Sequence, residues 1–516
     1  MHLGRTWVVL ESCWRIFLFG YNLCIIGPFE RNRMYKKQPD LGRLFDMYQS
    51  HLFFISVSLR DFYHNTFYNI MIQQENLKKR LAKLAAPIFI ETLLIMMLGA
   101  VDTVMLSRHS DNSVAAVGVV NQIIMLTFLV FEVINLGTSV LCSQYIGARL
   151  HKQVVQVVGV SILVNLVVGI TISMLLFGCA GPILRLMGLG PELMQDGMDY
   201  MRIVGAFAFF QALSLTLSAS LRSANKAVYP MLVTVVVNIL NIIGNYSLIF
   251  GRFGFPELGV EGAAISTAFS RGVSMIILFV ILFRKHIHSF PRVYFRPFPW
   301  VELKNLMKVG LPSAGEQLSY SSSQVVITYF INMLGVEALA TRTYCVNIIM
   351  FAYLFSISMA QGGAICIGHL IGEKKPHAAF LMGKYVMKKS VMITVILSGI
   401  LALFGHTIFG WLTSNPEIIR MGATVLMIDV VLEIGRPINI FATNALRAAG
   451  DVNYPFYVGL VVMWSVAVGL GYLFGIPFGW GICGMWVAFL LDENIRGAIF
   501  VRRWYSMKWV SKSFIK

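Results

Sequence analysis

Four carboxylates of this sequence lie inside long apolar runs, where an unpaired charge is expensive. Glu91 and Asp102 both belong to the run PIFIETLLIMMLGAVDTVML at 87–106, and Glu132 and Glu316 lie in similar surroundings. None of the four has a basic residue within one helical turn. Because an isolated charge at bilayer depth costs several kcal/mol, such carboxyl groups either are protonated and hydrogen-bonded across helices, or they titrate and bind a cation.

The first two carboxylates fit one face of one helix. Glu91 and Asp102 are eleven residues apart, which is about three helical turns and roughly 16 Å along the axis. A second polar face lies in NILNIIGNY, where Asn241 and Asn245 are four residues apart and Asn238 lies on the same side. Such amides either join helices or line a polar cavity. Since carboxylate and amide oxygens can coordinate Na⁺, and the same carboxylate can take up H⁺, Asp102 is a candidate ligand for either ion.

Other charged residues of the apolar runs have close neighbours of opposite sign. Glu433 is three residues before Arg436, and Asp492 and Glu493 are four and three residues before Arg496. Side chains at these spacings meet on one side of a helix. The spacing therefore fits a structural role and a functional role equally well.

The elements that must position these residues are transmembrane helices. The chain has 516 residues, of which 57% are hydrophobic and 13% charged, whereas soluble domains average ~25% charged residues. The seven cysteines are scattered singly and give no metal or disulfide spacing. We therefore predict an all-α, polytopic membrane protein. Its twelve predicted spans lie near 84–106, 114–139, 153–180, 196–218, 228–250, 259–283, 309–334, 339–368, 386–412, 420–444, 455–475 and 479–501.

The net charge of +17 comes from bases gathered in alternate loops, for example GARLHKQ, LRSANK and GEKKPHAAFLMGKYVMKK. Because Lys and Arg accumulate on the cytoplasmic side of membrane proteins, the pattern predicts a multi-pass protein of the cytoplasmic membrane with both termini inside. It explains the basic charge without a nucleic-acid partner. Residues 1–70 carry no clean span. We expect either a peripheral extension or a start assigned too early, with Met71 as the true beginning, and we favour the second.

The chain repeats itself at an offset of 225 residues. Four motif pairs share this offset: KLAAP (83–87) and KVGLP (308–312), YIGARL (145–150) and LIGEKK (370–375), LGPELM (189–194) and SNPEII (414–419), LRSANKAVYP (221–230) and LRAAGDVNYP (446–455). Glu91 shifted by the same offset is Glu316. We therefore predict two six-helix halves of equal orientation, related by an axis along the membrane normal, with the substrate site between them near the midplane.

The repeat divides the chain into five predicted parts. They are an N-terminal extension at 1–80, a six-helix N-lobe at 81–285, a cytoplasmic linker at 286–308, a six-helix C-lobe at 309–505 and a cytoplasmic tail at 506–516.

Residues 80–505 resemble the multidrug and toxic compound extrusion (MATE) transporters of bacteria. The resemblance is carried by GAVDTVMLSRHSDNSVAAVG, VNILNIIGNYSLIFG, LGVEGAAISTAFSR and the paired LR…YP loops. It implies two six-helix bundles that form a V, and export of organic, often cationic, compounds driven by H⁺ or Na⁺, with no other cofactor. It also implies that Asp102, Asn241 and Asn245 belong to an N-lobe cation site, which Thr267 joins with its hydroxyl.

The second lobe departs from the pattern of the better-known members. Where several of them carry an acid in the seventh helix, this chain has Tyr320, with Glu316 one turn earlier. In the tenth helix Arg436 takes the approximate place of an acid, and Glu433 lies one turn away. These residues therefore fit a C-lobe with its own cation site and a C-lobe without one.

Three other functions fit the sequence less well than export does. A flippase of lipid-linked sugars would use the same fold, but its cavity needs bases for pyrophosphate, and the locally unpaired buried charges here are acidic. An intramembrane enzyme lacks support, since the sequence has no HExxH or GxSxG motif. A channel is the weakest alternative, because neither half contains a filter-like loop. Asp102 is expected to be the main coupling residue. Glu91 is expected to matter less, because the cytoplasmic end of its helix is better hydrated.

Overall fold

The computed structural model describes residues 75–287 and 290–515. The expectations for residues 1–70 lie outside these ranges. From Leu77 onward the chain belongs to one compact unit, Leu77–Lys516. Within the described ranges every regular element is a helix, as the apolar composition predicts.

Among the described residues, twelve helical segments follow one another and overlap the twelve predicted spans. In the N-lobe they are the helix Glu75–Ser107, α4 (Asp111–Gly147), α5 (His151–Gly178) with the short α6 (Ala180–Leu186), α7 (Pro191–Ala206) with α8 (Ala208–Ser223), α9 (Val228–Ile249) and α10 (Gly259–Lys285). In the C-lobe they are α11 (Trp300–Met333), α12 (Val336–Gly372), α13 (Pro376–Leu403) with α14 (Gly405–Leu412), α15 (Pro416–Ala448), α16 (Asn453–Val462) with η2 (Met463–Leu470) and α17 (Gly471–Gly475), and α18 (Gly481–Tyr505). Short 3₁₀ turns, η1 (Arg292–Phe295) and η3 (Lys508–Lys512), lie outside the spans.

The helix bounds repeat at the offset that the sequence predicts. The bounds of α4 and of α5, each shifted by 225 residues, are the bounds of α12 and of α13. The bent pair α7–α8 shifted in the same way covers α15, which is a single helix. The N-lobe breaks this span by 46° at Phe207, so the two lobes share a topology but differ in this segment.

Not every span meets a simple test of length and hydropathy. Among the described residues eight helices are long and apolar enough to cross a membrane, and the α7–α8 pair makes a ninth. The remaining three spans are α11, α15 and α18. These helices carry many of the charged residues of the C-lobe, including Glu316, Arg436 and Arg496, and buried charges of this kind usually mark functional paths in membrane proteins.

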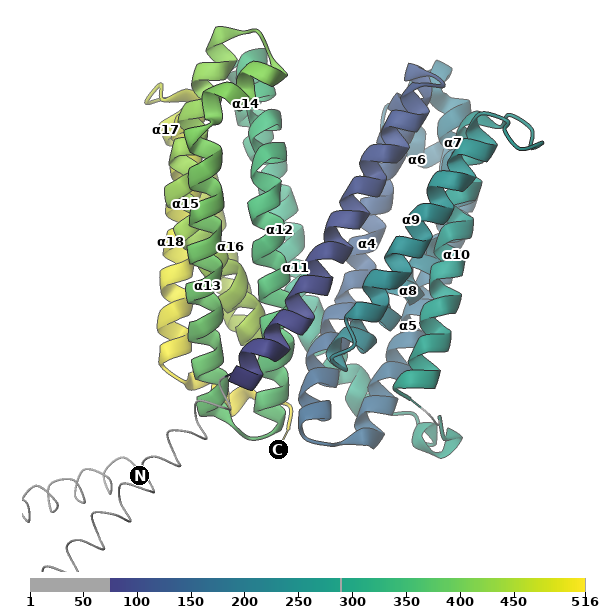
Figure 1. Cartoon of the computed structure of the whole chain (residues 1–516), viewed down its shortest axis with the longest axis vertical. Coiled ribbons are helices and arrows are strands. Elements are labelled where there is room, and N and C mark those ends of the chain that lie inside the picture. The colour runs from purple at the N-terminus through teal and green to yellow at the C-terminus, as the bar shows by residue number, and fades with distance from the viewer. Residues whose placement is uncertain (1–74, 288–289, 516) are drawn as a thin grey trace, which may run out of the picture. The chain divides into compact units, whose positions relative to one another are not determined.

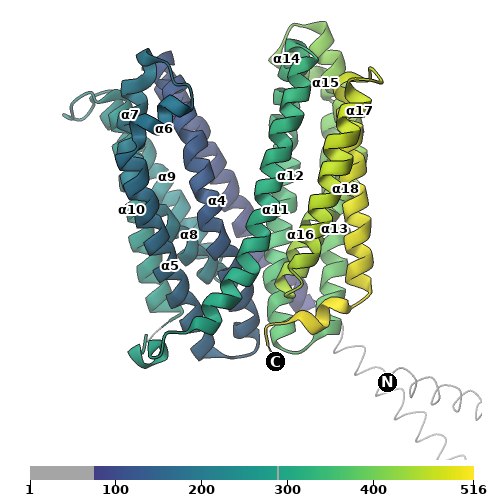
Figure 2. The same cartoon turned by 180° about the vertical axis from the view of Figure 1, so that it is seen from behind.

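The helices form two bundles, one for each lobe (Figure 1). The bundles meet at the end that carries the α4–α5 and α12–α13 loops and the C-terminus, and they diverge toward the end that carries α6 and α14 (Figures 1 and 2). The loops at the meeting end include the basic sequences RLHK at 149–152 and EKK at 373–375. The V shape that the resemblance implies is therefore present within this unit.

Glycines allow the bundles to approach closely at the meeting end. A Cβ at Gly147 of α4 would overlap the carbonyl of His369 on α12, and a Cβ at Gly372 would overlap the carbonyl of Gln144. Gln144 also donates from Nε2 to the carbonyl of Ala448 on α15, at 2.7 Å. Small residues permit such backbone contacts in membrane bundles, and the three contacts join α4 to both α12 and α15.

Candidate functional site

The N-lobe holds the predicted carboxylate–amide cluster. Asn245 of α9 donates from Nδ2 to Asp102 Oδ1 at 2.7 Å and also lies 3.0 Å from Asn241 Oδ1. Asn241 in turn donates to Thr267 Oγ1 of α10 at 3.4 Å. Both asparagines are buried, and Asp102 is half-buried. The structure thus brings together the four residues that the sequence assigned to one cation site.

Two residues beside this cluster escaped the sequence reasoning. Arg271 of α10 interacts electrostatically with Asp102, and its guanidinium lies 5.5 Å from the centre of the Phe128 ring. Tyr200 of α7 interacts with Arg271 and lies beside Thr267. A lone arginine in the middle of the apolar segment that forms α10 was the available signal. The positive charge of Arg271 offsets the negative charge of the Asp102 carboxylate and would oppose a cation bound beside it.

Glu91 does not share a partner with Asp102, although both lie on the first helix. Its Oε2 lies 3.7 Å from Nη1 of Arg222 on α8. The expectation that Glu91 lies in a hydrated position is wrong, because the residue is only 5% exposed. Glu91 lies in the middle of the helix Glu75–Ser107, where neighbouring helices cover it, and not at a helix end that water could reach.

The C-lobe repeats this ion pair. Arg447 Nη2 of α15 lies 2.6 Å from Glu316 Oε2 of α11, and both partners stand 225 residues after Glu91 and Arg222. Each lobe therefore joins its first span to its fourth by one glutamate and one arginine. The arginines lie in the repeated LR…YP motifs, near the ends of α8 and α15, so the signal was present in the sequence, but the pairing required the fold.

We expect Glu316→Gln to destabilise the protein, because the largely buried Arg447 would lose the carboxylate that it pairs with at 2.6 Å. Breaking a buried pair from one side costs about 3 kcal/mol or more. Thermal unfolding of the purified protein in detergent should show a lower midpoint, and Glu316→Gln combined with Arg447→Met should recover part of the loss. Glu417→Gln, an exposed glutamate of α15, is the matched control. A midpoint equal to that of the wild type would show that the pair contributes no stability.

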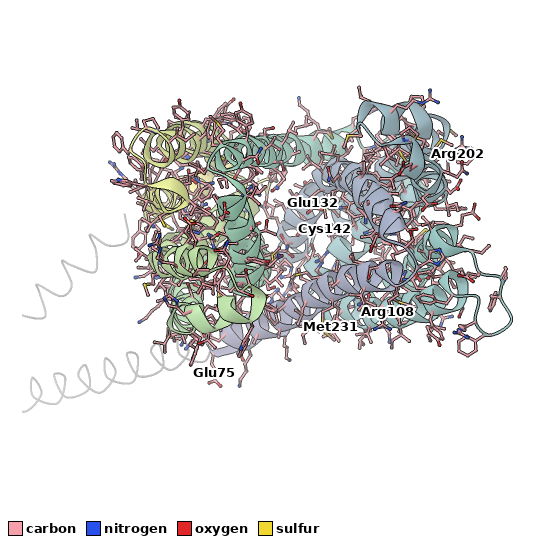
Figure 3. All side chains as sticks on the ribbon, turned by 90° about the horizontal axis from the view of Figure 1, so that it is seen from above. Glu75, Arg108, Glu132, Cys142, Arg202 and Met231 are labelled. Carbon is pink, nitrogen blue, oxygen red and sulfur yellow. The ribbon has the colours of Figure 1, made fainter. Side chains whose placement is uncertain are left out.

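Glu132 lies between the two lobes. Viewed from above, it stands on α4 between the bundles (Figure 3). It lines a small cavity of about 100 Å³ together with Arg222 of the N-lobe and Arg447 of the C-lobe. Asn135 donates to Glu132 Oε2 at 3.3 Å, and both arginines act electrostatically on its carboxyl group. One carboxylate is therefore placed between the two arginines that the repeat relates.

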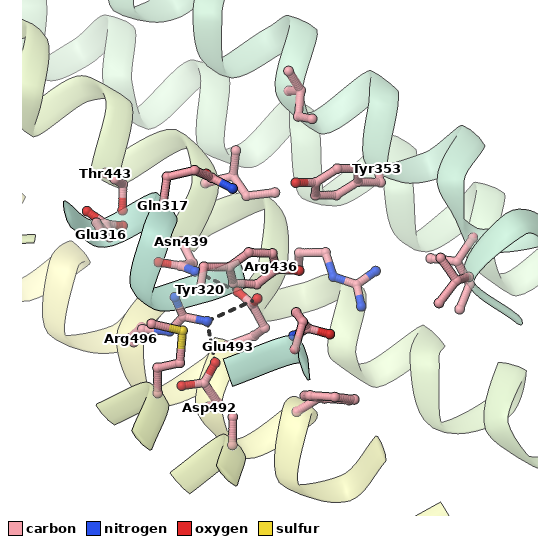
Figure 4. Close-up of a pocket in the computed structure, with 18 of the residues that line it drawn as sticks. Glu316, Gln317, Tyr320, Tyr353, Arg436, Asn439, Thr443, Asp492, Glu493 and Arg496 are labelled. Atoms are coloured by element: carbon pink, nitrogen blue, oxygen red, sulfur yellow. Dashed lines mark hydrogen bonds and ion pairs between the residues drawn. The ribbon is translucent and has the colours of Figure 1, made fainter. Parts of the chain in front are cut away.

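The C-lobe contains a larger cavity, of about 490 Å³, lined by α11, α12, α15, η2 and α18. The close-up shows Glu316, Tyr320, Arg436 and Arg496 around it (Figure 4). Since drug-sized ligands occupy cavities of roughly 300–1,000 Å³, its size suits a small organic molecule.

Two arginines of this cavity each bind two carboxylates. Arg436 pairs with Glu433 and, at 3.3 Å, with Asp429, which the sequence reasoning had not considered. Asp429 lies seven residues before Arg436, two turns away on the same helix, and this spacing was the missed signal.

Arg496 pairs with Asp492 and, at 3.2 Å, with Glu493. Asn439 donates from Nδ2 to the second oxygen of Glu493 at 2.6 Å. Each group of two acids and one arginine carries one negative charge when all members are ionised. Each arginine is therefore held between two carboxylates and is not free to bind an anion.

Comparison with known proteins places the chain in a family. A family model described as MatE matches residues 87–247 and 312–473. The chain is a member of the MatE family. The matched segments contain Asp102, Asn241 and Asn245 of the N-lobe cluster, and they end before the α18 charges of the C-lobe cavity.

This MatE protein matches its curated relatives over nearly the whole length of each relative. One is the "Uncharacterized transporter YisQ" of Bacillus subtilis, 42% identical over 84% of this chain and 95% of the relative. Another is the "Probable multidrug resistance protein NorM" of Thermotoga maritima, 26% identical over 88% of this chain and 98% of the relative.

Solved structures share the fold. "Crystal structure of MATE in the bent conformation" matches with a TM-score of 0.78 and 23% identity, over 84% of this chain and 97% of that one. A transporter of the MOP superfamily from Pyrococcus furiosus matches with a TM-score of 0.76 and 22% identity, over 85% of this chain and 97% of that one. The predicted MATE resemblance and the all-α, twelve-span, V-shaped fold are confirmed.

Proposed function

We propose that this MatE protein is an exporter of small organic compounds that exchanges them for H⁺ or Na⁺. Relatives named as multidrug resistance proteins support a small-molecule substrate. The observation that carries the coupling step is the chain Asp102–Asn245–Asn241–Thr267, which offers a carboxylate, an amide oxygen and a hydroxyl from three helices. Such oxygen donors suit a hard cation, and the carboxylate alone suits a proton.

The charge distribution supports a direction for the exchange. If the basic loops face the cytoplasm, the bundles meet on the cytoplasmic side and diverge toward the outside (Figure 1). This arrangement is the outward-facing state of an alternating-access cycle. A cation that enters from outside would then reach Asp102 while the cytoplasmic contacts of α4 with α12 remain closed.

Export by proteoliposomes tests the proposal. Purified full-length protein is reconstituted with ethidium as a cationic probe, and either a proton gradient or a sodium gradient is imposed. We expect ethidium movement against its own gradient with at least one of the two ions, and none without a gradient. Equal movement in protein-free liposomes, or no movement with either ion, would overturn the proposed function.

A further inference from the structure

One arginine of the C-lobe cavity has no carboxylate partner among the described residues. Arg342 of α12 lines the cavity with Arg436, Arg447 and Arg496. Each of the other three forms an ion pair with at least one acid. Arg342 contacts only neutral groups: it donates from Nη1 to Thr328 Oγ1 and from Nη2 to Gln324 Oε1, the latter at 3.0 Å. Its charge is therefore uncompensated at close range.

The neutral partners fix the direction of this guanidinium. Thr328 and Gln324 are four residues apart on α11, so they bind two nitrogens of Arg342 from one side. These two bonds use two of the five N–H donors of the group. A positioned guanidinium in a partly desolvated cavity is suited to bind the two oxygens of an acid group.

The wall next to Arg342 is aromatic. Tyr320 of α11 interacts electrostatically with Arg342, and Tyr353 of α12 interacts with Tyr320. The close-up shows both rings at the same cavity, one from each helix (Figure 4). Phe489 of α18 also lines it. These side chains form a surface on which a flat ring can pack.

The acids of the cavity do not offer an equivalent free site for a cationic group. Glu316 is paired with Arg447, and Asp492 and Glu493 are both paired with Arg496. An ammonium would have to compete with these guanidiniums, whereas an acid group meets no competing carboxylate at Arg342.

We propose that the C-lobe cavity binds aromatic compounds that carry one acid group, and that Arg342 binds this group. The inference rests on the proposed function, because it assigns a substrate class to the same transporter. It differs from the expectation of purely cationic substrates. Tyr320 and Tyr353 would hold the ring while the acid group occupies the N–H donors of Arg342 that point away from α11.

Equilibrium dialysis of radiolabelled 2-naphthoate with the purified full-length protein tests this proposal. The uncharged 2-naphthamide and the cationic 2-naphthylmethylamine share its ring and serve as matched probes. We expect 2-naphthoate to bind at least about tenfold more tightly than either, since a hydrogen-bonded charge contributes that much. Arg342→Gln should lower the affinity for 2-naphthoate about tenfold and leave that for 2-naphthamide unchanged. Arg342→Lys should restore part of the difference.

Arg420→Gln, at an exposed position of α15, is the control and should bind like the wild type. Equal binding of 2-naphthoate and 2-naphthamide to the wild type would overturn the proposal, as would a preference for the amine. The wild-type comparison decides the question even if Arg342→Gln does not fold. Wild-type protein that exports ethidium but does not prefer the acid overturns this inference alone. Loss of ethidium export with the acid preference intact overturns the proposed function alone.

Discussion

Asp102→Asn is expected to abolish gradient-driven export while the protein remains folded. The asparagine side chain has nearly the same shape, and its carbonyl oxygen can still accept the hydrogen bond that Asn245 donates at 2.7 Å. It cannot take up a proton, and it carries no charge to balance Na⁺. A coupling ion can shift the inward–outward equilibrium only by its differential affinity for the two states. A difference of about 3 kcal/mol corresponds to a population shift of roughly 150-fold.

The measurement is ethidium export by proteoliposomes under imposed H⁺ and Na⁺ gradients, together with thermal unfolding of the same preparation. Glu192→Gln, at an exposed position of α7, controls for the loss of one carboxylate in the N-lobe. We expect the control to export like the wild type. Export by Asp102→Asn at the wild-type rate under both gradients would show that this carboxylate serves only to hold helices together. Coupling would then have to lie in the C-lobe or at Glu132.

The parts of the fold that follow from local sequence were predictable. Apolar length determines a span, and the offset of 225 residues transfers the bounds of α4 to α12. The N-lobe cluster was predictable in two steps: spacing places Asn241 and Asn245 on one helix face, and the resemblance to MATE transporters joins them to Asp102 and Thr267. The break at Phe207 was not predictable, although Gly205 lies two residues before it, because an isolated glycine inside a helical segment is usually tolerated without a bend.

The ion pairs between helices show where the sequence reasoning stopped. A search within one helical turn finds no base near Glu91 or Glu316, because Arg222 and Arg447 are 131 residues further along the chain. Only tertiary packing brings these groups together. Sequence spacing alone therefore makes Glu91 and Glu316 look unpaired. It also gives the cavity an acidic character, because it does not show that Arg342 lies there with partners on another helix.

Glu132→Gln is expected to shift the protein away from the conformation seen here. The carboxylate lines a cavity of about 100 Å³, and Arg222 of the N-lobe and Arg447 of the C-lobe line the same cavity. Its negative charge attracts both arginines, so it holds the lobes together at this depth. Arg222 and Arg447 each keep their own glutamate, but without Glu132 they lose the carboxylate that they share across the interface. We expect a change of about 1–3 kcal/mol in the equilibrium between the two states, which is the usual range for such coupling.

Spin labels at Glu192 and Glu417, in a variant without native cysteines, report this shift. The two sites are exposed, are related by the repeat and begin α7 and α15, at the end where the bundles diverge (Figure 2). As the lobes separate around Glu132, these ends should approach, so electron–electron double resonance should show a larger population at short distance in Glu132→Gln. Glu132→Asp keeps the charge and should resemble the wild type. An unchanged distance distribution in Glu132→Gln would mean that the glycine contacts of α4 with α12 close this side without help from the carboxylate.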